Sequence, residues 1–441
     1  MRTLKNRNTK FCAMFVSSLV IFSWTYIHRN VDYTNCPGPE VKVFEQQGLH
    51  GVIVTADPER NQFAKESSQE RNSSEVSIMM WRAKYVHKMC EQIIWNASYV
   101  HARTPVFFYS KPNGLLACKS PKTGSTFMGA LIRALNQPSI NKVSGMFLLG
   151  RNKIHNGLHE VWDILAAEPI KQSTLTVMIT RDPYSRLFST FVDKYFLLGR
   201  LGRELATHLK RGFREDRNNE YCGYDITFQE FLDYIVFLAQ SMKELNEHMV
   251  PVAQLCDVCN MKYDLICRQE SLSEGITEVL RLTKNVTSSR LNAIRQSINT
   301  TSPYASMLSL ISSQIFDYNN HRQDCPNQLS FMRKMWKTFQ VQGLVNSVIK
   351  FPEEIFSGFL FVEKEAQAIT SASLQVIQSN PLSKKQRQQQ RLTALTIAYR
   401  NIRWQTIVNL QKVFKLDFLL FGYSNYPPII YNITRTTNGY I

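Results

Sequence analysis

Two segments that each have the pattern of a strand, a turn and a helix place the strongest constraint on how this chain folds. Residues 115–118 form a short apolar run, followed by a polar turn and a helical stretch at 127–135. Residues 175–180 form a continuous apolar run, as expected for a strand buried on both faces, and a second turn and helix follow it. Repeated units of this kind predict an α/β fold with a central parallel sheet flanked by helices.

The first turn has the properties of a phosphate-binding loop. Gly124 lets the backbone approach an anion closely, while Ser125 and Thr126 open a helix whose free N–H groups and dipole favour negative charge. Lys122 adds a mobile positive charge. The Walker pattern is absent, because here the lysine precedes the glycine. Taken alone, residues 121–126 are equally consistent with a helix cap beside an exposed lysine.

The second turn strengthens the phosphate interpretation. Arg181 lies at a strand's end, and Ser189 follows eight residues later inside the helix that Pro183 begins. Arg181 can form two charge-assisted hydrogen bonds to a terminal phosphate, and Ser189 can add a third. Arg186 faces the same anion or pairs with a carboxylate. Two such turns predict a site that binds opposite phosphates of one nucleotide.

These motifs resemble those of the Golgi carbohydrate sulfotransferases, particularly the group with the chondroitin and dermatan 4-O-sulfotransferases. Residues 121–126 resemble that family's 5′-phosphosulfate loop, and residues 181–194 its 3′-phosphate element. Similar segments follow in order at 227–231, 246–251, 255–264 and 416–423. The resemblance covers residues 81–426 and implies a P-loop-like sulfotransferase fold. The donor-binding residues that it implies are Pro121, Lys122, Thr123, Gly124, Ser125, Thr126, Phe127, Arg181, Arg186 and Ser189.

The chain departs from the family pattern at a few positions. Ser125 stands where many relatives have cysteine, and Met128 where an aromatic residue is usual. Residues 267–272 replace the family's Gly-Lys-Tyr-Glu-Thr-Leu pattern. These changes leave the acceptor open more than the reaction.

The resemblance implies transfer of a sulfuryl group from 3′-phosphoadenosine 5′-phosphosulfate (PAPS) to a glycan hydroxyl, with no metal required. The expected acceptor position is the 4-hydroxyl of N-acetylgalactosamine in chondroitin or dermatan. Two alternatives stay open. One is a heparan sulfate uronyl 2-O-sulfotransferase, and the other is a catalytically inactive glycan-binding protein of the same fold.

Catalysis needs a group that stabilises the leaving phosphate and a general base. Lys122 is the predicted stabilising group. His159 is the predicted base, because residues 157–162 resemble the segment that carries a catalytic histidine in related heparan-modifying sulfotransferases. A helix-capping or packing role for His159 is the alternative. The other candidates for the base are His155, His248, Glu247 and Glu270.

The N-terminus predicts a membrane anchor. Residues 11–27 are uncharged, at the short end of the range of about 17–25 residues that spans a bilayer. Four basic residues precede this run, which predicts a cytoplasmic N-terminus, and no small-residue cleavage site follows it. We therefore expect a type II, single-pass Golgi membrane protein. Its predicted parts are a cytoplasmic tail at 1–10, a signal anchor at 11–27, a stem at 28–80, a lumenal sulfotransferase domain at 81–426 and a C-terminal tail at 427–441.

Charge and modification signals agree with a lumenal, anion-binding protein. The formal net charge of +17 favours an anionic partner, which we interpret as the nucleotide donor and an anionic glycan and not as nucleic acid. The basic, Gln-rich stretch at 384–391 is either a solvated helix face or a glycan-contacting patch. The oligomeric state is open, and a homodimer is one option. Predicted N-glycosylation sites are Asn72, Asn96, Asn285, Asn299 and Asn432.

The cysteines predict disulfides. Of nine cysteines, Cys12 lies in the predicted span, which leaves eight for an oxidising compartment. Eight cysteines allow about 105 pairings, and the sequence does not select one. Cys256 and Cys259 have the spacing of half a zinc site, but no second pair accompanies them, so a structural role is favoured.

Overall fold

The computed structural model describes residues 41–46, 49–54, 77–92, 104–162, 169–170, 172–209, 223–322, 325 and 327–428. The chain divides into two compact units, residues 1–57 and 58–441. In the first unit, within the predicted stem, β1 (Val41–Gln46) pairs antiparallel with β2 (Leu49–Val54). The predicted signal anchor, residues 11–27, lies outside the described residues. Among the helices that are described, none combines the length and the apolar character needed to cross a membrane.

The second unit is built on a five-stranded sheet with the order β5-β3-β4-β6-β7. Its strands are β3 (Val106–Ser110), β4 (Leu115–Cys118), β5 (Glu160–Trp162), β6 (Leu175–Thr180) and β7 (Leu265–Arg268). The α/β prediction is confirmed, and β4, β6 and β7 are parallel. The sheet as a whole is mixed, however, because β3 runs antiparallel to both β4 and β5. The turn at 111–114 is too short for a crossover, so β3 and β4 can pair only as a hairpin.

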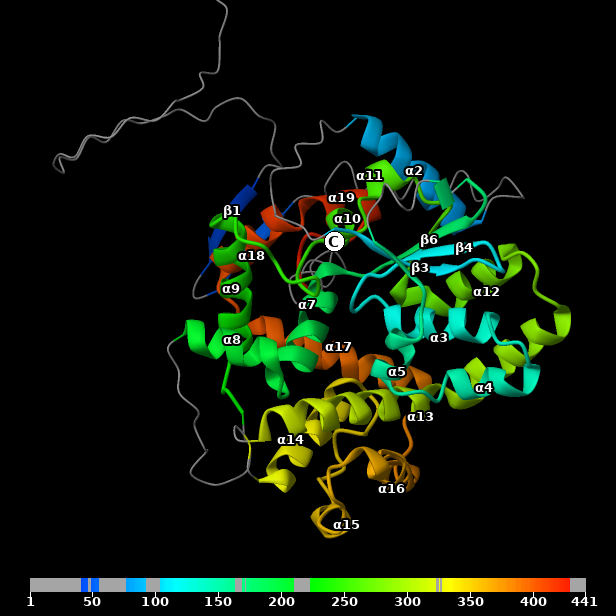
Figure 1. The fold of residues 1–441 in the computed structure, drawn as a ribbon. Coiled ribbons are helices and arrows are strands. Elements are labelled where there is room, and N and C mark those ends of the chain that lie inside the picture. The colour runs from blue at the N-terminus through cyan, green and yellow to red at the C-terminus, as the bar shows by residue number, and fades with distance from the viewer. Residues whose placement is uncertain are drawn as a thin grey trace, which may run out of the picture. The chain divides into compact units, whose positions relative to one another are not determined.

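Helices cover both faces of this sheet (Figure 1). One face packs against α3 (Ser125–Leu135) and α12 (Leu272–Leu282). The other packs against α2 (Ile78–Gln92), α10 (Val252–Leu255), α11 (Val258–Met261) and α19 (Lys415–Phe421). Alternation along β3 shows the two sides, since Phe108 joins the core under α3 while Phe107 joins the opposite core.

A third and larger core is helical. Of its helices, α13 is the longest and joins two cores, because Ile294 packs under α3 and α4 while Ile311 packs in the helical core. The remaining α-helices are α4 (Val143–Met146), α5 (Arg151–Asn156), α7 (Pro183–Phe191), α8 (Arg200–His208), α9 (Phe228–Gln240), α13 (Ser288–Asn320), α14 (Gln328–Val341), α15 (Glu353–Phe356), α16 (Ala366–Gln378), α17 (Lys384–Arg400) and α18 (Trp404–Val413). A π-helical turn, η4 (Val192–Phe196), continues α7.

Disulfides tie the second unit together, as predicted. Cys90 of α2 bonds to Cys259 of α11, and Cys118 at the end of β4 bonds to Cys256 just after α10. Cys256 and Cys259 are therefore structural cysteines in disulfides. Cys267 is buried and carries a free thiol.

Two predicted glycosylation sites fall on the described surface. Asn285 is exposed in the turn before α13, where its side-chain amide donates to the carbonyl of Pro112 at 3.0 Å. Asn299 is exposed on α13 itself. Asn72, Asn96 and Asn432 lie outside the described residues, and glycosylation at all five stays a prediction.

Candidate active site

Three turns meet at one edge of the sheet. Because β4, β6 and β7 are parallel, their carboxyl ends share this edge, which is where ligands bind in open α/β sheets. Residues 119–124 follow β4, residues 181–182 follow β6, and a 3₁₀ turn at Gln269–Ser271 follows β7. The two predicted phosphate-binding turns are thus neighbours.

The first turn has a backbone that few residues other than glycine adopt. Gly124 has φ +114°, and a Cβ there would lie 3.4 Å from Leu272 Cδ2. Lys122 also has a positive φ of +69°. No side chain caps the N-terminus of α3, which begins at Ser125, so its first N–H groups can receive an anion. Both the backbone shape and the open helix end fit a phosphate group.

A buried hydroxyl pair holds this turn against β6. Ser120 Oγ donates to the Ile179 carbonyl at 3.1 Å and lies 2.6 Å from Thr123 Oγ1. Thr123 is 1% exposed, so its hydroxyl stabilises the turn from inside. Ser125 and Thr126 are half-buried at the start of α3, and the ring of Phe127 packs beside that of Phe147 at a centroid distance of 5.9 Å.

A buried carboxylate gathers the positive charges of the site. Asp193 of η4 is 1% exposed and forms ion pairs with Lys122, Arg151 at 3.0 Å and Lys194 at 3.6 Å. Burial alone would raise the pKa of Asp193, but Arg151, Lys122 and Lys194 hold it well below its ordinary value. Burial lowers the pKa of Lys122 to about 7, although the attraction of Asp193 opposes this shift. The Lys122 amine is therefore held at the site and is unusually easy to deprotonate.

The second turn contacts the first directly. Arg181 Nη1 donates to the backbone carbonyl of Lys122 at 2.9 Å. Arg181 Nε is buried and has no hydrogen-bond partner among the described residues, so it is a donor that these residues leave unsatisfied. Ser189 is half-buried further along α7. Asp182 caps α7 by accepting from Ser185 N at 2.7 Å.

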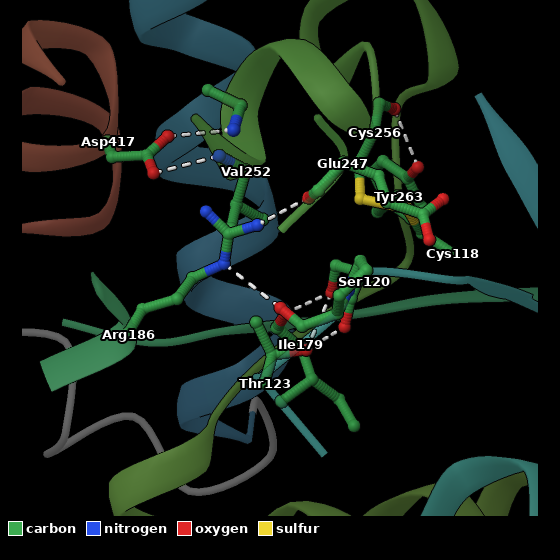
Figure 2. Close-up of a disulfide and its surroundings, with 12 residues drawn as sticks. Cys118, Ser120, Thr123, Ile179, Arg186, Glu247, Val252, Cys256, Tyr263 and Asp417 are labelled. Carbon is green, nitrogen blue, oxygen red and sulfur yellow. Dashed lines mark hydrogen bonds between the residues drawn. A yellow bond between two sulfur atoms is a disulfide. The ribbon is translucent and has the colours of Figure 1, made fainter. Parts of the chain in front are cut away.

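Arg186 lies elsewhere. Its side chain is fully buried, and three of its nitrogens donate to backbone carbonyls. Figure 2 shows Arg186 with its hydrogen bond to Glu247. Nε donates to Pro121 at 3.0 Å, Nη1 to Val250 at 2.6 Å and Nη2 to Glu247 at 2.9 Å. Sequence reasoning offered an anion or a carboxylate as its partner, and the structure gives it carbonyls from two loops instead. Binding of the donor by Arg186 stays a prediction without a contact that supports it.

The three candidate histidines occupy different places. His159 is exposed beside the ring of Tyr109, at a centroid distance of 5.5 Å, and Tyr109 packs with the core opposite α3. His155 of α5 lies on the α3 side, with Nε2 3.3 Å from Thr126 Oγ1. His248 lies near Lys122 and Lys194, whose positive charges add to burial in lowering its pKa well below its ordinary value. The base assignment to His159 stays a prediction.

Sequence reasoning missed two features of the site. Arg151 lies in a segment without any motif, so no pattern pointed to it. Asp193 stood inside the quoted 3′-phosphate segment, but its role as the partner of Lys122 depends on a contact between residues 71 positions apart.

Comparison with known proteins gives the family. A model described as the sulfotransferase family matches residues 105–338, just over half of the 441 residues. This stretch contains both predicted phosphate-binding turns, Asp193 and the Arg186 contacts. The chain belongs to the sulfotransferase family.

Curated relatives narrow the class. Carbohydrate sulfotransferase 10 of Xenopus laevis is 28% identical over 189 residues, 40% of this chain and 52% of that protein. Carbohydrate sulfotransferase 14 of Mus musculus is 31% identical over 103 residues, 23% of this chain and 27% of the relative. Carbohydrate sulfotransferase 11 of Danio rerio is 33% identical over 138 residues, 30% of this chain and 39% of the relative. The chain thus spans at most about half the length of these relatives. No solved structure gave a significant match.

Proposed function

We propose that this protein transfers a sulfuryl group from PAPS to a hydroxyl of a glycan. The observation that carries the proposal is the hydrogen bond from Arg181 to the Lys122 carbonyl, because it brings the two phosphate-binding turns into contact at one sheet edge. Family membership and relatives named carbohydrate sulfotransferases support both the donor and the class of acceptor.

Each turn has its own task in this proposal. PAPS supplies a sulfuryl group on a phosphate that leaves as the new bond forms. Gly124 and the open N-terminus of α3 bind the 5′-phosphosulfate. Lys122 leaves its ion pair with Asp193 and binds the phosphate oxygen on which negative charge develops as the sulfuryl group departs. Arg181 and Ser189 bind the 3′-phosphate, with the unpaired Nε of Arg181 as one donor. Catalysis then rests on positioning and charge stabilisation, as in phosphoryl transfer.

The proposed acceptor is a chondroitin or dermatan chain, at the 4-hydroxyl of N-acetylgalactosamine. Support comes from the ordered motif resemblance and from the charge of +17. The basic stretch at 384–391 forms the first turns of α17. Burial lowers the pKa of Arg181, and the positive charge of Arg391 lies close enough to lower it further. A sulfated or uronate-bearing chain is suited to such a surface. The heparan alternative was suggested by the segment around His159, whose ring lies beside that of Tyr109.

We also propose a Golgi location with the catalytic unit in the lumen. The uncharged run at 11–27, five sequons and two disulfides between distant segments support this placement. Disulfides form and persist in oxidising compartments, not in the cytosol.

The test uses the full-length chain solubilised in detergent. It is incubated with radiolabelled PAPS and separate samples of desulfated chondroitin, dermatan and heparosan, followed by disaccharide analysis of labelled products. We expect label at the 4-position of N-acetylgalactosamine, and none with Lys122→Ala. Label on the uronate 2-position would replace the proposed acceptor with the alternative one. Glycan binding without transfer to any polymer would favour an inactive glycan-binding protein.

A further inference from the structure

Arg186 forms hydrogen bonds both to the loop that carries His248 and to residues 119–124, the turn predicted to bind the donor and called here the donor turn. Arg186 donates to Glu247 and Val250 on either side of His248, and also to Pro121 next to Lys122. Thr190 Oγ1 adds a hydrogen bond to the His248 carbonyl at 3.0 Å. The position of His248 relative to Lys122 is therefore set by a fully buried side chain.

The disulfide Cys118–Cys256 fastens the same two loops a second time. Cys118 ends β4, three residues before Pro121, and Cys256 follows α10, which begins two residues after Val250. Asp417 of α19 caps α10 by accepting from Val252 N and Ala253 N at 2.8 Å each. Figure 2 shows the disulfide, Arg186 and Asp417 around these loops.

One hydrogen bond sets the proton on the imidazole of His248. Asn246 Oδ1 lies 2.7 Å from His248 Nδ1 and also accepts from the His248 backbone N–H at 3.1 Å. A backbone N–H can only donate, so the Asn246 atom is the oxygen, and Nδ1 must carry the proton. Nε2 then holds a free lone pair, and no described residue hydrogen-bonds to it. The side chain is 18% exposed.

We propose that His248 is the general base of sulfuryl transfer, oriented by Asn246 and positioned against Lys122 by Arg186. This inference rests on the proposed function and names the group that accepts the acceptor's proton. The acceptor oxygen forms a bond to sulfur while the bond between sulfur and the donor phosphate oxygen breaks. The hydroxyl proton passes to Nε2 of His248, and the leaving nucleotide keeps the electron pair of the broken bond.

The other two histidines fit this role less well. His155 Nε2 already contacts Thr126 Oγ1 at 3.3 Å, and its Nδ1 is buried without a partner among the described residues. Neither nitrogen of His155 is open to an acceptor. His159 contacts Tyr109, which pairs with Leu116 inside β4, two residues before the end of the strand from which residues 119–124 start. His248 alone joins an oriented, accessible nitrogen to the loop system that holds Lys122.

The charges around His248 keep it ready to accept a proton. Lys122 faces it from the donor turn, Lys194 and Asp193 from η4, and Arg186 from α7, while Glu247 lies 3.9 Å away on its own loop. Burial and the positive charges of Lys194, Lys122 and Arg186 lower its pKa, and only Asp193 opposes this shift. Because the base is active when neutral, the acid limb of the pH–rate profile should lie well below pH 6.5.

The test measures transfer and donor binding separately on the full-length chain. His248→Ala and His248→Asn are compared with wild type, using radiolabelled PAPS with desulfated dermatan and, in parallel, 3′-phosphoadenosine 5′-phosphate (PAP) in calorimetry. Asparagine keeps a donor toward Asn246, so this variant preserves the loop if alanine does not fold. We expect kcat to fall by about 10²–10⁴-fold, unchanged PAP affinity, and partial rescue of the alanine variant by added imidazole.

Two matched variants complete the test. His155→Ala and His159→Ala should each lose far less kcat than His248→Asn, because neither histidine is the base in this inference. Asn246→Asp places a negative charge beside Nδ1, which should raise the pKa of His248 and move the acid limb of kcat to higher pH. A merely structural loss would not move the acid limb. Near-normal kcat in His248→Asn, or a loss of kcat confined to His155→Ala or His159→Ala, would overturn the assignment of His248 and leave the proposed function standing. Absence of transfer by the wild-type chain to any polymer would overturn the proposed function and this inference with it.

Discussion

Arg181 donates a hydrogen bond to the backbone carbonyl of Lys122 at 2.9 Å. The bond joins the turn after β6 to the turn after β4, and it uses Nη1 while Nε stays unpaired among the described residues. One guanidinium thus supports the backbone of the lysine turn and keeps a donor for a ligand. The account of donor binding depends on this arrangement.

Lys122→Ala should abolish transfer without unfolding the protein. The amine is buried in an ion pair with Asp193, which keeps Arg151 and Lys194 as partners when the lysine is removed. Its loss removes the charge that stabilises the leaving phosphate, so kcat should fall by at least about 10²-fold. Transfer assays and thermal unfolding measure the two effects. Turnover close to wild type would remove Lys122 from its proposed role.

Raising the pH should stabilise the wild-type chain relative to Lys122→Met. The pKa of Lys122 is about 7 in the folded state against an ordinary value of 10.5, so between these values the unfolded chain binds more protons. Stability therefore rises with pH across this window. Urea unfolding of both proteins at pH 7 and pH 9.5 measures the difference, and an unchanged or reversed difference contradicts the assigned burial of the amine.

Arg186→Met should destabilise the fold more than it alters donor recognition. The substitution leaves three carbonyls without their donor, at a cost of about 1–3 kcal/mol for each buried group that stays unsatisfied. Arg200→Ala is the matched control, because Arg200 is 70% exposed in an ion pair with Glu204 and should change stability by less than about 1 kcal/mol. Equal stability of the two variants would show that the Arg186 contacts do not hold the loops.

Gly124→Ala should weaken donor binding, whereas Gly145→Ala should not. A side chain at φ +114° costs about 1–3 kcal/mol and forces the turn away from its anion-binding shape. A Cβ at Gly145 meets nothing within 4 Å. PAP affinity and thermal unfolding of both variants test this contrast, and equal PAP affinity would argue against a backbone cradle.

Removal of each disulfide separates stability from catalysis. Cys118–Cys256 and Cys90–Cys259 close segments of 138 and 169 residues, so losing either should cost about 2–5 kcal/mol. Only Cys118–Cys256 joins the donor turn to the His248 loop, so the double alanine variant of that pair should lose more kcat. A matching kcat loss in both variants would point to general unfolding instead.

The strands and the helix that border the two turns were predictable from the sequence. β4 and β6 occupy residues 115–118 and 175–180, as predicted, because both are continuous apolar runs that end in polar turns. α3 starts at Ser125, one of the two hydroxyl residues that were predicted to open it, and ends at Leu135 as the helical stretch at 127–135 predicted. β3 was not predicted, and neither was its antiparallel direction, which depends on the short turn at 111–114 and not on the composition of the strand.

The site divides in the same way. The meeting of Lys122 and Arg181 follows from parallel strands that share an edge, which the sequence pattern implied. The carbonyl partners of Arg186 and the Lys122 partner of Asp193 come from loops about 60–70 positions away in the chain, so no local pattern could give them. The same holds for His248, whose neighbours at Arg186 and Lys122 exist only once the loops are folded.

The most direct test of the account is calorimetric binding of PAP and of 5′-AMP, which lacks the 3′-phosphate, to wild type and Arg181→Ala. If the two turns bind opposite phosphates of one nucleotide, wild type binds PAP more tightly than 5′-AMP, and Arg181→Ala loses that difference. An Arg181→Ala protein that still prefers PAP by the wild-type margin would contradict the central claim.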